Sequence, residues 1–522
     1  MGVNIPRLGI FLAALLTVSC ASSPVSHSPP PLPVDPDGEW ASWGARRLPL
    51  LEPCELPNVE ETLLCGTIGV TENRRVESRR QISLNVVVVP AQAIDPPNDP
   101  VFVFEGGPGG AATRRAASLV WAGPVRQRDI VLVDQRGTGA SNPLTCDVGG
   151  GRTVVGELRE MFPAADVRSC AEELATRVDL NAYTTEHFAD DIEDIRQQLG
   201  YGPINVRGGS YGTRSMMVFA QRHPESVRSL FGIAITSPLR PSLAERGLWS
   251  EKVLVGLGEL CQTDGECTRV APDLFRMVAD LAASLDSGPR RVTLADPNDA
   301  SLTMTLDVSR DWLMEHLRLI LYYSWTSNAL PWAVHRAHGE DDWEPLIQMA
   351  VVIQRMFRSN LSYGVLLTVQ CSGHMGFDTA AALARGQGTL FGNYRLEQQI
   401  QGCESWPHQK HPTLGVVEPQ ALDVPTLFLS GGLDPVGPPG YAEDASRFFP
   451  NNVHIVLPHG QHGPFDSEAS WLCIHQVWAD FLDNGTEALD VSCTEKLTRQ
   501  PVIASGEAFS EHLANVLAPM AE

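Results

Sequence analysis

Short apolar segments alternate with helical patterns in two parts of the chain. The apolar segments are Val101–Phe104, Asp129–Asp134, Val227–Ile235, Val424–Ser430 and Asn452–Leu457. They are mostly apolar in continuous runs rather than at every second residue, as is typical of strands in a parallel sheet that helices cover on both faces. Two earlier segments, 66–70 and 81–90, are expected to be strands joined through a charged turn. The pattern predicts an α/β fold with a mostly parallel central sheet.

The helical patterns are clearest around a Gly-rich segment in the middle of the first part. Ile192, Ile195 and Leu199 lie on one face of a predicted helix that Gly200 and Gly202-Pro203 end. A short apolar run from Ile204 follows, and a second helix is predicted from about Thr213 to His223, before Pro224. The order is therefore helix, strand, Gly-rich turn, helix.

The strand and helix alternation stops after Pro238 and resumes near Val424. The intervening residues 241–422 are predicted to be mostly helical, for example over 311–323 and 344–357. Six of the eleven tryptophans lie here, and we expect most of them to form the core of this insertion and some to line a pocket beneath it. They are Trp249, Trp312, Trp325, Trp332, Trp343 and Trp406.

These changes of pattern divide the 522-residue chain into a split core and a large insertion. We expect the first part of the core at 43–240, a helical cap at 241–422, the second part of the core at 423–495, and a C-terminal tail at 496–522.

The N-terminus is expected to lie outside the fold. One basic residue, Arg7, precedes an apolar run from Leu8 to Val18, which is too short for a membrane-spanning helix and is typical of a signal peptide over residues 1–20. The segment ending Leu16-Thr-Val-Ser-Cys20 resembles a bacterial lipoprotein signal, with Cys20 as the lipidated residue; ordinary cleavage near Ala21 is the alternative. Residues 21–42, rich in Pro and Ser at first, are predicted to form an extended tether.

Cysteine content agrees with export. Cys20 apart, ten of the eleven cysteines remain, an even number that fits an oxidising compartment. They occur as near neighbours, which predicts five local disulfides, although spacing alone does not determine connectivity; a zinc site is disfavoured because no C-x-x-C pair occurs. The expected pairs are Cys54 with Cys65, Cys146 with Cys170, Cys261 with Cys267, Cys371 with Cys403, and Cys473 with Cys493.

Charge narrows the choice of partners. The formal net charge is −23, and no basic cluster extends beyond two adjacent arginines, so nucleic acid is not an expected partner. Contact with a membrane is expected only through a lipid at Cys20. A monomer is favoured, and no cofactor or metal is implied.

Gly208-Gly-Ser-Tyr-Gly212 has the pattern of a nucleophile elbow, because it lies between the predicted strand and helix. Ser210 would be the nucleophile, and Tyr211 would direct its backbone N–H at a developing oxyanion. The alternative is an ordinary Gly-Ser loop. A second Gly-rich loop, Glu105–Gly110, follows the strand at 101–104; it completes no phosphate-binding motif, and Gly107 is the expected second oxyanion donor.

An acid and a histidine follow the last two predicted strands. Asp434 comes after the first and His462 after the second, which is the chain order Ser, Asp, His of α/β-hydrolases. The rivals are His459 for the histidine, or a metal-binding His459-x-x-His462 pair, and Asp423 and Asp444 for the acid. Asp423 precedes its strand, and Asp444 lies in a predicted helix.

Five motifs in this order resemble one family: Phe104–Gly110, Val133–Gly139, Gly208–Gly212, Gly431–Asp434 with Pro438-Pro439, and His459–Gly463 followed by Cys473. Together they resemble the secreted tripeptidyl aminopeptidase and proline iminopeptidase family of α/β-hydrolases, over roughly residues 43–493. The resemblance implies a serine exopeptidase that acts on peptides with a free N-terminus. Two departures concern substrate preference: Glu105 replaces the commoner Asn or His, and Ile235–Pro238 replaces an Asp-Gly pair.

An exopeptidase of this kind must hold a protonated α-amine, which requires a carboxylate near the cap. The candidates are Glu105, Glu245, Glu251, Asp311 and Glu315. The Asp134-Gln135-Arg136 segment is expected to be structural, with Arg136 binding carboxylates near the mouth of the site. The alternatives to a peptidase are an esterase or acyltransferase on the same fold, and a binding protein without catalysis.

Overall fold

The computed structural model describes residues 39–77, 80–149, 153–236, 242–297, 299–374, 377–407, 419–463, 465 and 467–517. The predicted signal peptide, Cys20 and most of the predicted tether lie outside the described residues. The last residues of that tether are helical instead, because α1 spans Glu39–Arg47 and buries Ala41 and Gly44 against β2 and its neighbours.

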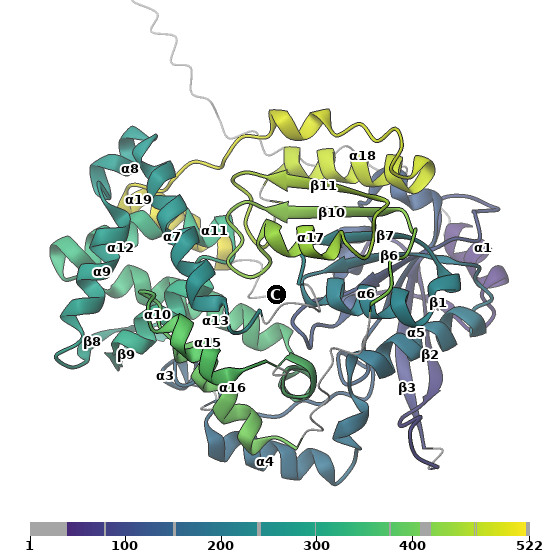
Figure 1. The fold of residues 1–522 in the computed structure, drawn as a ribbon, viewed down its shortest axis with the longest axis horizontal. Coiled ribbons are helices and arrows are strands. Elements are labelled where there is room, and N and C mark those ends of the chain that lie inside the picture. The colour runs from purple at the N-terminus through teal and green to yellow at the C-terminus, as the bar shows by residue number, and fades with distance from the viewer. Residues whose placement is uncertain are drawn as a thin grey trace, which may run out of the picture.

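A nine-stranded sheet forms the centre of the first unit (Figure 1). Its strand order is β1-β2-β3-β5-β4-β6-β7-β10-β11. The pairs among β1, β2, β3 and β5 are antiparallel, and all pairs from β5 to β11 are parallel. The strands are β1 (Glu52–Cys54), β2 (Leu63–Thr71), β3 (Gln81–Val89), β4 (Val101–Phe104), β5 (Ile130–Val133), β6 (Ile204–Gly209), β7 (Val227–Ile233), β10 (Thr426–Gly431) and β11 (Asn452–Leu457).

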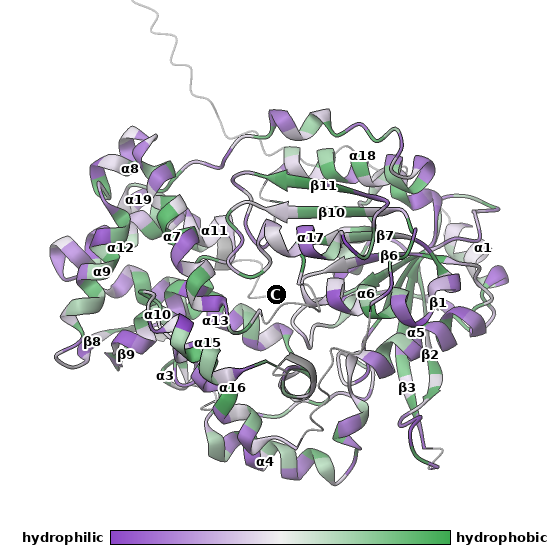
Figure 2. Ribbon diagram, in the orientation of Figure 1, coloured by the Kyte–Doolittle hydropathy of each residue, from purple (hydrophilic) through white to green (hydrophobic). Residues whose placement is uncertain are grey.

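Helices cover both faces of this sheet, because successive side chains of each strand point to opposite faces. Phe102 and Phe104 of β4 pack on one side with α5 (Thr185–Gln198), α6 (Tyr211–Arg222) and α17 (Pro439–Ala445). Val101 and Val103 pack on the other side. The helices there are η1 (Ala112–Arg115), α2 (Ala116–Leu119), η2 (Gly123–Gln127) and α18 (Glu468–Asn484). Figure 2 shows hydrophobic residues along the central strands and mixed hydropathy on the covering helices. The expected α/β-hydrolase architecture is confirmed.

The segment between β7 and β10 forms a second unit with its own core (Figure 1). Its helices are α7 (Arg246–Gln262), α8 (Gly265–Val270), α9 (Leu274–Ser284), α10 (Arg310–Ile320), α11 (Ser324–Ser327), α12 (Leu330–Glu340), α13 (Glu344–Asn360), α14 (Tyr363–Val369), η5 (Gln370–His374), α15 (Thr379–Gly386) and α16 (Tyr394–Ser405). It also contains an antiparallel hairpin that the sequence pattern did not predict, β8 (Arg290–Asp296) with β9 (Asp299–Val308). We refer to 242–405 as the cap.

Segments from outside 242–405 also pack against the cap. Helices α3 (Val154–Glu157) and α4 (Ala164–Ala175) contribute to its hydrophobic clusters, although both precede β6 in sequence. At the other end of the chain, α19 (Gly506–Leu517) buries Phe509 in the cap core. The expected C-terminal tail is therefore partly helical and packed. The remaining short helices are η3 (Leu180–Ala182), η4 (Pro224–Ser226) and η6 (Ser492–Lys496).

The described part of the chain contains five disulfides, and their pairing is the expected one. Cys54–Cys65 joins β1 to β2, Cys146–Cys170 holds a loop to α4, and Cys261–Cys267 joins α7 to α8. Cys371–Cys403 joins η5 to α16, and Cys473–Cys493 joins α18 to η6. Closing such loops restricts the unfolded chain and stabilises the fold. Among the described residues, no helix has the length and apolar character needed to cross a bilayer.

Arg136 is a structural residue in the loop after β5. Its Nε and Nη2 donate to the two carboxylate oxygens of Asp191, at 2.7 and 2.6 Å, and Nη1 donates to the carbonyl oxygen of Ala182 at 2.7 Å. Both side chains of the ion pair are fully buried. Arg136 therefore fastens the loop to α5.

Replacing Arg136 with Ala is expected to destabilise the protein, because the buried Asp191 carboxylate would lose two hydrogen bonds and keep only the one from Arg74, at 2.7 Å. Loss of one member of a buried ion pair costs up to about 3–5 kcal/mol, and Arg74 offsets part of this cost. Urea unfolding would measure the change, with Arg276→Ala as control, since the Arg276 pair with Asp280 is exposed and contributes little to stability. Equal unfolding midpoints for the two variants would contradict the structural role.

Candidate active site

Ser210 lies in a sharp turn between β6 and α6. Its φ of 53° and ψ of −124° are unusual for a residue with a side chain. Two glycines allow this turn: a Cβ on Gly208 would lie 2.6 Å from the carbonyl oxygen of Gly212, and one on Gly212 would lie 2.0 Å from that of Phe104. The sequence between strand and helix therefore folds into an elbow that raises Ser210 above the sheet.

The turn brings Ser210 to the edge of the sheet where Asp434 and His462 also lie. Asp434 follows β10 and His462 follows β11, and the carboxyl ends of these parallel strands share that edge. Nε2 of His462 lies 2.7 Å from Ser210 Oγ, and Nδ1 lies 2.9 Å from each oxygen of Asp434. The structure thus brings together the three residues that the motif order singled out.

The hydrogen bonds around Asp434 determine the proton positions. Oδ1 accepts from the backbone N–H groups of Val436, at 2.7 Å, and Gly437, at 2.9 Å, and the side chain is buried. An ionised carboxylate can only accept, so the facing Nδ1 of His462 carries the proton. Nε2 is then the acceptor for the Ser210 hydroxyl. This is the arrangement in which a histidine removes a proton from a serine.

The rival residues lie elsewhere. His459 and Asp423 are exposed on the surface. Asp444 lies within α17 and pairs with Arg447. The alternative that His459 and His462 bind a metal is disfavoured, because the two ring nitrogens of His462 already contact Ser210 and Asp434.

The two expected oxyanion donors, Tyr211 and Gly107, both line the cavity that contains Ser210. Tyr211 lines the cavity and is the first residue of α6, where backbone amides and the helix dipole favour a negative charge. In the Gly-rich loop after β4, the N–H of Gly106 donates to Oε1 of Glu105 at 3.0 Å. Gly106 is thereby committed to its neighbour, which leaves the lining residue Gly107 as the better candidate for the second donor.

The backbone of the elbow has support that the sequence did not indicate. The carbonyl oxygen of Ser210 accepts from the hydroxyls of Thr213, at 2.6 Å, and Thr236, at 2.8 Å. The N–H of Thr236 donates to Thr213 Oγ1 at 2.9 Å. Thr236 belongs to the segment that departs from the family pattern, so the departure places a hydroxyl beneath the elbow.

The cap also positions the histidine loop. The N–H of His462 donates to the carbonyl oxygen of Tyr322 at 2.9 Å, and the two rings meet edge to face with centroids 5.2 Å apart. Beside them, Ser327 of the cap and Gln461 of the loop are joined by hydrogen bonds. No motif marked Tyr322, and the motif His459–Gly463 gave Gln461 no role, because each residue acts through a contact between segments distant in sequence.

A cavity of about 590 Å³ lies above Ser210, between the sheet edge and the cap. Cap residues including Tyr323, Trp325 and Phe357 supply its apolar walls. Of the six tryptophans in the insertion, Trp325 is the one that lines this cavity. Trp343 and Trp406 are buried in the hydrophobic clusters of the cap instead.

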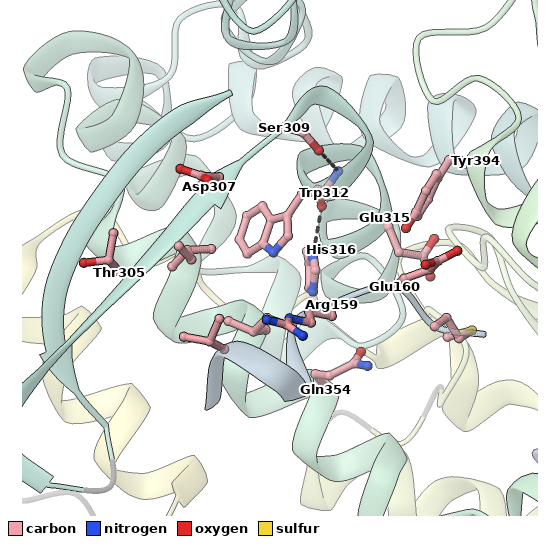
Figure 3. A pocket seen from close by; sticks show the side chains of 14 residues that line it. Arg159, Glu160, Thr305, Asp307, Ser309, Trp312, Glu315, His316, Gln354 and Tyr394 are labelled. Carbon is pink, nitrogen blue, oxygen red and sulfur yellow. Dashed lines mark hydrogen bonds between the residues drawn. The ribbon is translucent and has the colours of Figure 1, made fainter. Parts of the chain in front are cut away.

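Among the five candidate carboxylates for an amine anchor, only Glu105 lines the cavity with Ser210. Glu245 accepts from the Tyr441 hydroxyl at 2.8 Å, Glu251 accepts from the N–H of Leu390 at 2.5 Å, and Asp311 is exposed. Glu315 lines a separate cap cavity of about 400 Å³. Figure 3 shows Glu315 beside Glu160 and Tyr394 at one end of that cavity, with Trp312 and His316 nearer its middle.

Glu105 is held in an ion pair. Arg115 Nε donates to its Oε2 at 2.6 Å, and Arg115 Nη2 donates to its Oε1 at 3.0 Å. Burial raises the pKa of the Glu105 carboxyl, but the guanidinium of Arg115 and the N–H of Gly106 lower it more, so the pKa lies below its ordinary value. Glu105 is therefore an anion at neutral pH.

Comparison with known families agrees with the fold. Residues 99–254 match the family described as alpha/beta hydrolase fold, and residues 388–493 match the family described as TAP-like protein. The first match contains Ser210, and the second contains Asp434 and His462. The chain therefore has the α/β-hydrolase fold, with a TAP-like C-terminal part.

Curated relatives match the chain over part of its length. A tripeptidyl aminopeptidase of Streptomyces lividans is 28% identical over 203 residues, which cover 36% of this chain and 38% of the relative. A proline iminopeptidase of Neisseria gonorrhoeae is 31% identical over 146 residues, which cover 28% of this chain and 36% of the relative. The matches thus span little more than a third of these relatives. The resemblance seen in the motifs is confirmed at this level.

Solved structures resemble the chain more distantly. A serine hydrolase from Cycloclasticus zankles matches with a TM-score of 0.37 and 11% identity. The match covers 80% of this chain and 98% of the chain of that hydrolase. A proline iminopeptidase-related protein from Thermus thermophilus has a TM-score of 0.34 and 15% identity, and covers 81% of this chain and 98% of its own.

Proposed function

We propose that this α/β-hydrolase is an exported serine exopeptidase that releases short peptides or single residues from a free peptide N-terminus. The observation that carries the proposal is the set of contacts from Ser210 Oγ to His462, at 2.7 Å, and from His462 to Asp434, at 2.9 Å. The names of the tripeptidyl aminopeptidase and proline iminopeptidase relatives support a peptide as the substrate.

In the proposed reaction, Ser210 Oγ attacks the scissile carbonyl carbon while His462 Nε2 takes the hydroxyl proton. The carbonyl oxygen gains negative charge, which the N–H groups of Gly107 and Tyr211 would stabilise. His462 then returns the proton to the leaving amine as the C–N bond breaks, and the acyl group remains on Ser210 as an ester. A water molecule, deprotonated by His462, hydrolyses this ester and regenerates the hydroxyl.

Glu105 is the proposed anchor for the substrate amine. It is the one carboxylate of the five candidates in the cavity, and it is ionised. Its two oxygens have capacity for a further donor beside Arg115, because a carboxylate offers about four acceptor sites. The ammonium group would therefore be held near the Gly-rich loop, within reach of Ser210.

An esterase is the second candidate, and one observation favours it: the charge of Glu105 is already balanced by Arg115. An ester substrate needs no carboxylate anchor, so it would tolerate this pairing. A binding protein without catalysis is disfavoured, since such a role requires none of the contacts among Ser210, His462 and Asp434.

Export is proposed from two features. Five disulfides are typical of proteins in an oxidising compartment. The first 20 residues have the pattern of a signal peptide, and a lipid on Cys20 would hold the protein at the cell envelope.

A panel of substrates tests the peptidase proposal. The protein without residues 1–20 is assayed with a free-amine tripeptide amide, its N-acetylated form, single-residue amides of Pro and Ala, and a short-chain ester. We expect the free-amine tripeptide to exceed its acetylated form in kcat/KM by about 10- to 100-fold, the usual value of a charged hydrogen bond. Ester hydrolysis without amide cleavage would instead establish the esterase.

Glu105→Gln tests the anchor within the same panel. The variant is expected to lose most of the preference for the free amine while its rate on the acetylated peptide changes little. Arg115→Gln, which removes the ion pair but keeps the carboxylate, is the matched control and should retain the preference. An unchanged preference in Glu105→Gln would place the anchor elsewhere.

A further inference from the structure

The cavity above Ser210 carries an excess of positive charge. Glu105 is its one lining carboxylate, whereas six arginines line it. These are Arg114, Arg115, Arg207, Arg246, Arg318 and Arg395. Arg115 is neutralised by Glu105, and Arg114 is exposed and donates to the carbonyl oxygen of Ser359 at the rim. Such an excess is unexpected in a site that binds only an ammonium group.

Three of these arginines come from different helices of the cap and meet at one end of the cavity. Arg246 begins α7, Arg318 lies in α10, and Arg395 lies in α16. All three also line a small adjoining pocket. We call Arg246, Arg318 and Arg395 the cap arginines.

Only part of this charge is balanced. Glu315 pairs with Arg318, at 2.5 Å and 2.9 Å, and both side chains are buried. Burial and then the proximity of Arg318 lower the pKa of Arg395 to about 10, and Arg246 contributes in the same direction. Among the residues that line the adjoining pocket, Glu315 is the one carboxylate beside the three arginines.

Two of the cap arginines have donors in need of an acceptor. Nη1 of Arg246 and Nη1 of Arg395 are buried and make no hydrogen bond within the described part of the chain. Arg395 Nη2 donates to Gln399 at 3.0 Å, so that side chain is held in place while Nη1 remains available. A buried donor without an acceptor costs free energy, which a bound anion would recover.

The cap arginines lie near the reacting atoms. The guanidinium of Arg318 is 5.6 Å from the ring centroid of Tyr322, and that ring is 5.2 Å from the ring of His462. An extended peptide spans about 3.3–3.6 Å per residue, so Arg318 lies at most about three residues from His462. Arg246 and Arg395 line the same cavity. A substrate bound at Ser210 can therefore reach the cap arginines with a group close to its scissile bond.

We propose that the cap arginines form a subsite for a substrate carboxylate, so that the enzyme prefers short peptides with an acidic group within about three residues of the scissile bond. The planar guanidinium matches a carboxylate with two parallel hydrogen bonds, which suits Arg246 and Arg395. The carboxylate belongs to an Asp or Glu side chain or to the free C-terminus of a short peptide. The inference rests on the proposed exopeptidase function and adds a substrate class to it.

The test compares peptides that differ in one charge. Free-amine tripeptide amides carry Glu or the isosteric Gln at each of the three positions, and a tetrapeptide is offered with a free or an amidated C-terminus. We expect at least one acidic member to exceed its neutral partner in kcat/KM by about tenfold or more, because the neutral group leaves the arginines unsatisfied. The position at which the acidic group raises kcat/KM shows whether the subsite binds an acidic side chain or the free C-terminus of the peptide.

The variants Arg246→Gln and Arg395→Gln should each reduce this ratio toward one. Arg276→Gln removes an exposed cap arginine on α9 and is the matched control, which should keep the ratio. Thermal unfolding of each variant checks that the cap remains folded. Equal rates for acidic and neutral members, or a ratio that both variants retain, would overturn the subsite.

An inhibition assay separates this inference from the proposed function. Glutarate is expected to inhibit hydrolysis of p-nitrophenyl acetate by competition in the unsubstituted protein, and far less in Arg246→Gln. Glutaramide, its neutral analogue, should inhibit neither. If glutarate inhibits but no peptide amide is cleaved, the exopeptidase proposal fails and the anion subsite stands. If the neutral peptides are cleaved but glutarate has no effect, the subsite fails alone.

Discussion

Replacing Ser210 with Ala is expected to lower kcat for every cleaved substrate by about 10⁴- to 10⁶-fold, as loss of the nucleophile does in other serine hydrolases. The physical reason is that, in the proposed reaction, the acyl-enzyme ester forms on the Ser210 hydroxyl, whose oxygen lies 2.7 Å from Nε2 of His462. The fold should be unaffected, because Ala removes one oxygen and leaves the strained backbone of the elbow in place.

Rates on the free-amine tripeptide amide and on the ester would measure this effect, with unfolding curves for both proteins. Ser215→Ala is a suitable control, since Ser215 lies one turn further along α6 and is buried outside the cavity lining. Residual activity within tenfold of the original would show that another residue performs the attack.

The second large effect is expected for Asp434→Asn, which should lower kcat by about 10⁴-fold. Asp434 accepts a hydrogen bond from Nδ1 of His462 and two from the backbone N–H groups of Val436 and Gly437. An amide can turn its NH₂ toward His462, which would put the ring proton on Nε2. That nitrogen could then no longer accept the proton of Ser210.

The matched control for this variant is Asp444→Asn, which removes a carboxylate of α17 that pairs with Arg447. It should leave kcat within about twofold, because surface ion pairs contribute little. A comparable loss in both variants would mean that kcat responds to the fold rather than to the Asp434–His462 contact.

Much of the sheet was predictable because its strands are apolar on both faces. Residues 101–104 and 227–233 have no polar alternation, and each has a Gly or Pro signal nearby. The elbow was recognisable because close backbone contacts leave no room for a Cβ at Gly208 and Gly212. This steric requirement appears in the sequence as two glycines. The disulfides are local, and neighbouring cysteines in the sequence are the ones that pair.

The hairpin β8–β9 was not predicted. Its strand β8 has one buried residue, Leu294, among exposed and partly exposed ones, so the apolar signal of a strand is weak there. Strand β8 forms because it pairs with β9, and not because its residues are buried.

The features that set substrate preference depend on contacts between distant segments. The cap arginines are separated by more than seventy residues at each step, from 246 to 318 to 395, and each lies in a different helix of the cap. The packing of α3 and α4 on the cap likewise joins segments on either side of β6 and β7. No local pattern encodes these contacts, because tertiary packing alone brings the residues together.

The central claim is that Ser210 is acylated by peptides bound through a free amine. Its most direct test is intact-mass analysis of the protein after reaction with a free-amine tripeptidyl diphenyl phosphonate and with its N-acetylated form. We expect one phosphonyl group, mapped to Ser210, with faster labelling by the free-amine reagent and no labelling in Ser210→Ala. Labelling at another residue, no labelling of the unsubstituted protein, or equal rates for the two reagents would contradict it.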